Sequence, residues 1–342
     1  MINNKIYVLS AKQISIQNPL SEDWMTAPIC YSEPFVRSID PNFKEYVSPI
    51  EARRMGKILK RALATSKEAI KASQLDTVDA IITGTGFGCI ENTEFFLDAL
   101  CKEGEQLLKP TYFMQSTHNT ISSLVAIQTK NHGYNATYAH KGISFDSALQ
   151  DAWLQLRLGK IQSALVGGHD EMTPSFFTIL QKGEVFGKQV ALTGEAAVSV
   201  VLGTKAEAAL CQLSGFKMLY KPTLDDLIAS VSTMLQSAGK SLSDVDAVLT
   251  GINGDEACDK AYLEETKALF GDKPILRYKH LFGDSFTASG LGFYVGAHCL
   301  NVGVIPSQLF VSQQNMSIDK PKCILLFNRS DGKDYTLTLI EK

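Results

Sequence analysis

The sequence predicts a layered α/β fold made of two similar halves. Strand-like and helix-like segments alternate along all 342 residues, which is the pattern of sheets covered by helices. The heptapeptide VDAIITG at 78–84 recurs as VDAVLTG at 245–251. A predicted amphipathic helix precedes each copy, and a glycine ends it. We infer that one unit was duplicated, and we expect the two copies to occupy equivalent places in the fold.

The first half opens with residues 1–16, whose apolar positions alternate as in a strand. Apolar residues at helical spacing predict a helix over 53–73, just before the first copy of the repeat. A second helix is predicted over 145–158, and its Trp153 is expected to pack in the core. The apolar run 196–202 predicts a fully buried strand.

The second half repeats this alternation. A helix is predicted over 224–238, followed by the second copy of the heptapeptide, and the apolar run 323–327 predicts a late buried strand. No linker rich in proline, glycine or serine separates the halves, and the best seam lies near 205–214. We therefore expect an N-terminal half at 1–205 and a C-terminal half at 206–342.

Composition excludes several classes of function. The chain is 45% hydrophobic and 20% charged, which is ordinary for a globular protein with a large core. Its formal net charge of -3 argues against a nucleic-acid partner. No apolar run is long enough to span a bilayer, and no secretory leader is visible, so no membrane insertion is expected. The seven cysteines are scattered without a CxxC pair, which argues against a zinc site or disulfides and favours the cytoplasm.

The segment 138–168 is the most informative part of the chain. It reads as a strand end, a tight turn, a long helix and a buried strand closing on Gly167-Gly168. A nucleophile is often presented at the start of such a helix, where the helix dipole stabilises a thiolate. Here the turn is HKGIS, residues 140–144, and it contains no cysteine.

Several motifs together resemble the β-ketoacyl synthase family. GTGFGCIE at 84–91 resembles the family's GSGIGGLE element, and GKIQSALVGGHDE at 159–171 resembles GDADVMLAGGAE. TGEAAV at 193–198 resembles LGEGAGV, YKHLFGD through ASG at 278–290 resembles KSxxGHxxxAAG, and GVIP at 303–306 matches outright. The resemblance spans nearly the whole chain. It implies a thiolase-like fold with two duplicated βαβ halves in a five-layered αβαβα arrangement.

The family condenses acyl thioesters with one cysteine and two histidines. The resemblance places the cysteine at Gly142 and the histidines at Asn253 and Asp284, so all three catalytic residues are absent. Lys279 alone remains of the usual set. Glu264 or Glu265 is the expected acidic partner of Lys279. No cofactor and no metal is implied.

A substitute nucleophile is a second interpretation of the same segment. Ser144 lies in the turn and His140 precedes it, but a serine without a partnered base is a poor nucleophile. His118 and Asn119, like His140, lie on segments that resemble the pocket or dimer interface of the family. Cys89 is expected to be a buried structural thiol, and the GTGFG run lacks the spacing of a nucleotide-binding loop.

In lacking all three catalytic residues, the chain resembles the chain-length-factor subunits of the family. These pair with an active ketosynthase and shape its tunnel, which implies a heterodimer, or a homodimer in isolation, and an acyl carrier protein as partners. Phe113, Met114 and Gln115 are candidates for a tunnel stop, and the competing interpretation is that Phe113 and Met114 fill the core of the chain. The closing loop 327–332 departs from the family's GFGGxN, and its first residue, Phe327, is a candidate pocket or interface residue.

The pair QSTHNT at 115–120 and HKGISF at 140–145 resembles ketosynthase-like proteins of aryl polyene and flexirubin-type pigment pathways. That resemblance implies a polyunsaturated acyl chain. Two alternatives stay open: a diverged ketosynthase or acyltransferase with a non-standard nucleophile, and a stand-alone acyl-thioester binding protein.

Overall fold

The computed structural model describes residues 4–188, 192–312 and 316–342. Its centre is a ten-stranded sheet in the order β10-β9-β13-β14-β8-β1-β7-β5-β3-β4. The strands of the first half are β1 (Ile6–Ile14), β3 (Ala80–Gly84), β4 (Tyr134–Tyr138), β5 (Ser163–Asp170) and β7 (Ala196–Gly203). Those of the second half are β8 (Cys211–Tyr220), β9 (Ala247–Thr250), β10 (Ile275–Arg277), β13 (Cys323–Ser330) and β14 (Asp334–Glu341).

The two halves of the sheet meet only where β1 pairs with β8. That junction is three residue pairs long, whereas β1 and β7 pair along most of their length. Five strands lie on each side of it. The five strands on the β1 side all end before residue 205, and the five on the β8 side all begin after residue 206. The exact boundary between the halves remains a prediction.

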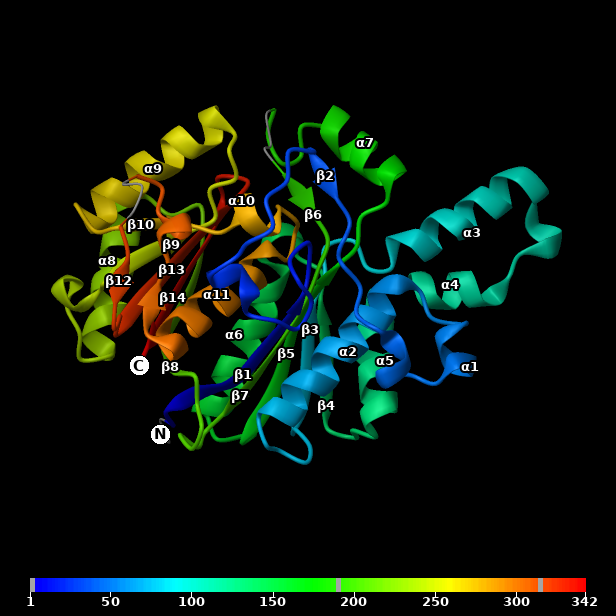
Figure 1. Cartoon of the computed structure of the whole chain (residues 1–342), viewed down its shortest axis with the longest axis horizontal. Coiled ribbons are helices and arrows are strands. Elements are labelled where there is room, and N and C mark those ends of the chain that lie inside the picture. The colour runs from blue at the N-terminus through cyan, green and yellow to red at the C-terminus, as the bar shows by residue number, and fades with distance from the viewer. Residues whose placement is uncertain (1–3, 189–191, 313–315) are drawn as a thin grey trace.

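Helices cover the sheet in layers (Figure 1). The helices α2 and α5 form one hydrophobic cluster with the first half, and α8 and α9 form another with the second. Between the two halves, α6 and α11 share a central cluster with strands of both. The predicted αβαβα arrangement is confirmed. The bounds of these helices are α2 (Lys57–Ala72), α5 (Thr120–Thr129), α6 (Ser144–Arg157), α8 (Leu224–Ser237), α9 (Glu256–Phe270) and α11 (Ala288–Val302).

The remaining elements are short or peripheral. They are α1 (Pro49–Ala52), α3 (Ile90–Glu103), α4 (Pro110–Ser116), α7 (Pro174–Lys182), α10 (Lys279–Phe282), β2 (Phe35–Val36), β6 (Thr193–Gly194), β11 (Val304–Ile305) and β12 (Ile318–Asp319).

The repeated heptapeptide occupies equivalent places. Its first copy forms β3, which pairs in parallel with β4 and β5, and its second forms β9, which pairs in parallel with β10 and β13. The repeated aspartate also makes the same contacts. Asp79 accepts hydrogen bonds from the backbone N–H groups of residues 162 and 163, at 2.7 and 3.0 Å, and Asp246 from those of residues 322 and 323, at 2.6 and 2.9 Å. In each half the aspartate therefore holds the start of the neighbouring parallel strand.

Most predicted helix ends lie within one or two residues of the observed ones. The exception is the helix predicted from residue 53, which begins at Lys57 because Gly56 adopts an extended conformation and caps it. Residues 49–52 form a separate turn, α1, capped by Ser48. Trp153 is half-buried and its ring lies 6.5 Å from that of Phe216, so it packs against the central cluster as expected.

Helices α3 and α4 form an arm that projects from the body, on the side away from β9 and β10 (Figure 1). Only Ile90 and Asn92 of α3 are buried. Two aromatic pairs, Phe95 with Tyr112 and Phe96 with Phe113, hold the two helices together, each with ring centroids 5.4 Å apart. Among the described residues, no helix combines the length and hydropathy that a bilayer span requires.

Candidate functional site

A cavity of about 550 Å³ opens where the two halves meet. The turn before α6 contributes Gly142, and the loop after β9 contributes Asn253. Lys279 and Asp284 lie at the two ends of α10, and residues 328–332 form another wall. The structure thus brings together all three positions where the expected catalytic residues are missing, with the retained lysine. The volume of this cavity is typical of small-molecule sites.

The polar groups of this cavity are bonded to one another. Lys279 Nζ lies 2.7 Å from Asp284 Oδ1, and Asn253 Nδ2 donates to Asp284 Oδ2 at 2.8 Å. The Asn253 amide also lies 2.9 Å from the carbonyl oxygen of Phe186. Asp284 is 3% exposed. Its carboxylate is therefore neutralised by the lysine and held by the amide, an arrangement that offers no imidazole to transfer a proton or to stabilise an enolate.

The predicted acidic partner of Lys279 is wrong. Glu265 instead faces Arg329, with its carboxylate 3.4 Å from Nε, and accepts a hydrogen bond from Tyr335 at 3.2 Å. Glu264 is exposed on α9. Lys279 pairs with Asp284 because both flank the one-turn helix α10, and Asp284 stands where the resemblance placed a histidine.

The turn at Gly142 has no space for a nucleophile. A Cβ atom on Gly142 would lie 2.2 Å from Ser330 Oγ and 3.0 Å from Ser330 Cβ. Ser330 ends β13 and comes from the other half of the chain. Ser330 therefore fills the space beside Gly142 where the resemblance places the cysteine side chain, and no sequence pattern pointed to this serine.

A family model for the β-ketoacyl synthase N-terminal domain matches residues 24–243. The chain belongs to the β-ketoacyl synthase family. A search of curated proteins finds no match.

Three solved structures resemble the chain over almost its full length. The ishigamide ketosynthase/chain length factor has a TM-score of 0.81 at 16% identity, and a β-ketoacyl synthase from Burkholderia phymatum STM815 has 0.80 at 13%; each alignment covers 99% of both chains. The third is AntDE:AntF, a type II PKS acyl-carrier protein in complex with its ketosynthase bound to the hexaketide. It has a TM-score of 0.79 at 15% identity, again over 99% of both chains. At these identities the likeness establishes the thiolase-like ketosynthase fold.

Ser144 and His140 do not form the nucleophile–base pair of the second interpretation. The Ser144 hydroxyl donates to the carbonyl oxygen of Lys141 at 2.7 Å and accepts from the backbone N–H of His140 at 2.8 Å. The His140 ring lies 3.2 Å from the hydroxyl of Ser147 instead. Ser144 is fully buried, and the geometry gives it the role of closing the turn before α6.

The glycine-rich turn after β3 is closed from within. The carboxylate of Asp170 accepts hydrogen bonds from the backbone N–H groups of Gly86 and Phe87, at 2.8 and 3.0 Å, and from the hydroxyl of Thr85 at 2.9 Å. A phosphate would need those same N–H groups, so the turn is no nucleotide cradle. Cys89 follows it fully buried, and burial raises the pKa of its thiol well above the usual range.

The other predicted site residues lie outside the cavity. Phe113 and Met114 are 58% and 69% exposed on α4, and His118 and Asn119 are exposed just before α5. Phe327, predicted as a pocket or interface residue, is fully buried and lines a second, smaller cavity instead of this one. Its ring packs against Tyr262 and Phe270 in the outer cluster, because the alternation along β13 points it away from the main cavity.

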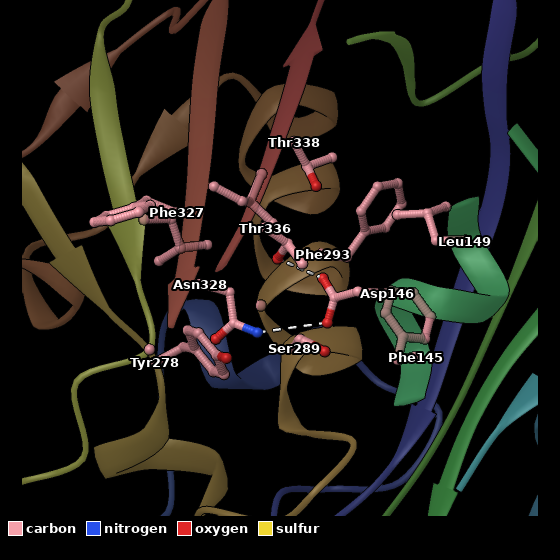
Figure 2. A pocket seen from close by; sticks show the side chains of 14 residues that line it. Phe145, Asp146, Leu149, Tyr278, Ser289, Phe293, Phe327, Asn328, Thr336 and Thr338 are labelled. Atoms are coloured by element: carbon pink, nitrogen blue, oxygen red, sulfur yellow. Dashed lines mark hydrogen bonds between the residues drawn. The ribbon is translucent and has the colours of Figure 1, made fainter. Parts of the chain in front are cut away.

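The second, much smaller cavity of about 10 Å³ shares Gly251, Ser289 and Asn328 with the first and is lined by Asp146 (Figure 2). Asp146, on α6, accepts hydrogen bonds from Thr336 at 2.8 Å and from Asn328 at 3.4 Å, both from the second half. Burial raises the pKa of its carboxyl, and the hydrogen bonds oppose that shift. This space suits about one water molecule. No sequence pattern pointed to Asp146, since an acidic residue in the first turn of a helix is favoured by the helix dipole alone.

No group of three or more histidine, cysteine or acidic side chains in the described part of the chain is arranged to hold a metal ion.

Proposed function

We propose that this chain is a non-catalytic, chain-length-factor-type subunit that pairs with an active β-ketoacyl synthase during acyl-chain elongation on an acyl carrier protein. One observation carries the proposal. A cavity lies where the resemblance places the family's active site, but within it Asp284 is paired with Lys279 and bonded to Asn253, and Ser330 lies where the resemblance places the nucleophile's side chain. Condensation needs a thiolate and donors aimed at a developing enolate, and neither is available here.

Two surfaces support a role in pairing. Strand β4 ends the sheet, with β3 as its one neighbour in the described sheet, so its outer edge offers unpaired backbone groups to a second chain. The arm, whose α4 contacts the helix α5 that packs on β4, carries Phe113 and Met114 exposed, so the alternative that both fill the core of this chain is wrong. Exposed apolar side chains beside a free sheet edge are typical of an obligate interface.

The arm also supports a role in setting chain length. Gln115 anchors α4 by donating to the carbonyl oxygen of Arg54 and accepting from Asn92 at 3.2 Å, so it is fixed within the chain. Phe113 packs one side of its ring against Phe96, yet it and Met114 are more than half exposed and can contact a neighbouring chain. An acyl chain gains about 0.8 kcal/mol for each buried CH₂, and we expect these two side chains to end the space in which a partner's acyl chain is buried.

The motif resemblance at 115–120 and 140–145 supports a finer assignment, to an aryl polyene or flexirubin-type pathway with a polyunsaturated acyl chain. The scattered cysteines favour the cytoplasm. Co-expression with a ketosynthase that keeps its cysteine and two histidines tests the proposal. A stable heterodimer that elongates a carrier-bound chain is expected.

Intact-mass analysis of the purified chain after incubation with malonyl- and acyl-carrier protein completes the test. No covalent adduct is expected. An acyl adduct on this chain would support the diverged enzyme instead, and a monomer that binds acyl thioesters but no ketosynthase would support the stand-alone binding protein.

A further inference from the structure

A carboxylate lies beside the free edge of the sheet. Tyr134 and Tyr138, at the two ends of β4, point to the side of α6, where the hydroxyl of Tyr134 donates to Asp151 Oδ2 at 3.1 Å. Asp151 Oδ1 accepts from Gln155 Nε2 at 2.8 Å. Burial, and then the charge of Asp151, raise the pKa of Tyr138 to about 12. Asp151 is therefore close to the phenols at both ends of the strand, which places it level with the middle of β4.

Asp151 has no cationic partner in its own chain. Its hydrogen bonds among the described residues come from a phenol and an amide, and no lysine, arginine or histidine there pairs with it. The nearby Arg157 is turned toward the ring of Trp153, with its guanidinium carbon 5.0 Å from the ring centroid. The carboxylate is half-buried already. It lies at a surface that a second sheet edge would cover.

Exposed apolar side chains lie near the edge strand, on the strand itself and on the helices α5 and α6 that pack against it. Tyr134 is 45% exposed, Leu154 on α6 is 44% exposed and Ile127 on α5 is 72% exposed. A chain that extends the sheet at β4 would cover these side chains together with Asp151. Covering them removes water from around Asp151, and an unpaired charge without water is costly.

We propose that Asp151 selects the occupant of the β4 edge: a different chain that presents a positively charged side chain opposite Asp151, rather than a second copy of this chain. The proposal rests on the proposed pairing function and names the chemistry of the partner. Antiparallel pairing of two copies about a two-fold axis is self-complementary, so each contact occurs twice. With Asp151 level with the middle of β4, the axis would bring two like charges together in the covered interface, which disfavours association.

The test uses the chain as its own partner. Asp151→Lys is prepared beside the unmodified chain, and sedimentation velocity measures dimerisation of each alone and of an equal mixture. Each is expected to dimerise weakly alone, because two carboxylates or two ammonium groups then meet. The mixture should dimerise at least about tenfold more tightly, since each interface then pairs opposite charges. Raising the salt concentration to about 1 M should weaken dimerisation in the mixture and strengthen dimerisation of the unmodified chain, because salt screens both attraction and repulsion.

Two further variants guard the interpretation. Asp151→Asn keeps the shape and removes the charge, and alone it should dimerise more tightly than the unmodified chain. Asp225→Lys makes the same change in charge on α8, on the far side of the other half, where the side chain is exposed, and it should leave dimerisation unchanged. Circular dichroism checks that every variant is folded.

Several results would overturn the inference. It fails if the unmodified chain already forms a tight homodimer that Asp151→Asn does not strengthen, or if the mixture of opposite charges dimerises no better than its components. It also fails if an active ketosynthase binds the chain and Asp151→Asn binds it equally well. In that last case the pairing function stands and only the role of Asp151 falls. Failure of every ketosynthase to bind would instead defeat the pairing function.

Discussion

Gly142 is predicted to tolerate no side chain while Ser330 is present. The perturbation is Gly142→Ala, whose Cβ would lie 2.2 Å from Ser330 Oγ. Favourable contacts between non-bonded heavy atoms begin near 3.5 Å, so the overlap exceeds one ångström. Gly142 does not have the positive φ that favours glycine, so the cost is packing alone.

The expected magnitude follows from what Ser330 can do. Overpacking by one methyl group costs about 1–3 kcal/mol when the neighbours cannot move away. Turning the Ser330 hydroxyl relieves the closest contact, but Ser330 Cβ remains at 3.0 Å. We therefore expect Gly142→Ala to lower the free energy of unfolding by about 1–2 kcal/mol.

A double-mutant cycle isolates the contact. Ser330→Gly alone is expected to cost less than about 1 kcal/mol, because it removes a small, half-buried side chain at a strand end. The double variant Gly142→Ala/Ser330→Gly should recover most of the loss, giving a coupling energy of about 1 kcal/mol or more between the positions. Urea denaturation followed by circular dichroism measures each free energy of unfolding.

Gly183→Ala is the matched control. Gly183 also has a negative φ, of -84°, and a Cβ there would come no closer than 3.5 Å to any atom. This variant should be neutral within about 0.5 kcal/mol. If Gly142→Ala is equally neutral, or if Ser330→Gly fails to rescue it, then Ser330 does not fill the nucleophile's place and that reasoning is refuted.

The remaining predictions test other parts of the molecule. Asp79→Ala and Asp246→Ala should each destabilise the chain by about 1 kcal/mol, because both leave two backbone N–H groups without their acceptor; unequal urea midpoints would contradict their equivalence. Lys279→Met should cost about 3 kcal/mol by leaving a buried carboxylate unpaired. Thermal unfolding monitors that loss, and Lys279→Met/Asp284→Leu should recover most of it. Glu171 has its pKa raised from 4.5 to about 7, mainly by burial, so its ionisation should lower stability by at most about 3 kcal/mol as pH rises from 4.5 through 7. Glu171→Gln should flatten that dependence in urea titrations at several pH values. In a working heterodimer, shortening Met114 to Ala should lengthen the product seen by mass spectrometry, whereas Gln128→Ala on the neighbouring helix should not.

Much of the fold could be predicted from the sequence because it rests on local patterns. The heptapeptide repeat correctly predicted a strand in each half, and the apolar spacing placed α6 and α8 to within a residue. The start of α2 was predicted four residues too early, because the extended Gly56 that caps the helix does not disturb the apolar spacing. Periodicity reports which face is buried, and it says little about where a helix is capped.

The sequence by itself determined which residues stand where the resemblance places the catalytic cysteine and histidines, since residue identity at Gly142, Asn253 and Asp284 requires no coordinates. Only the tertiary structure decided what replaced them. Ser330 approaches Gly142 from 188 positions along the chain, and Lys279 turns to Asp284 rather than to a glutamate of α9. Such contacts depend on how the two halves pack against each other, which no local spacing encodes. The same holds for Asp151, whose lack of a cation is visible only once α6 lies beside β4.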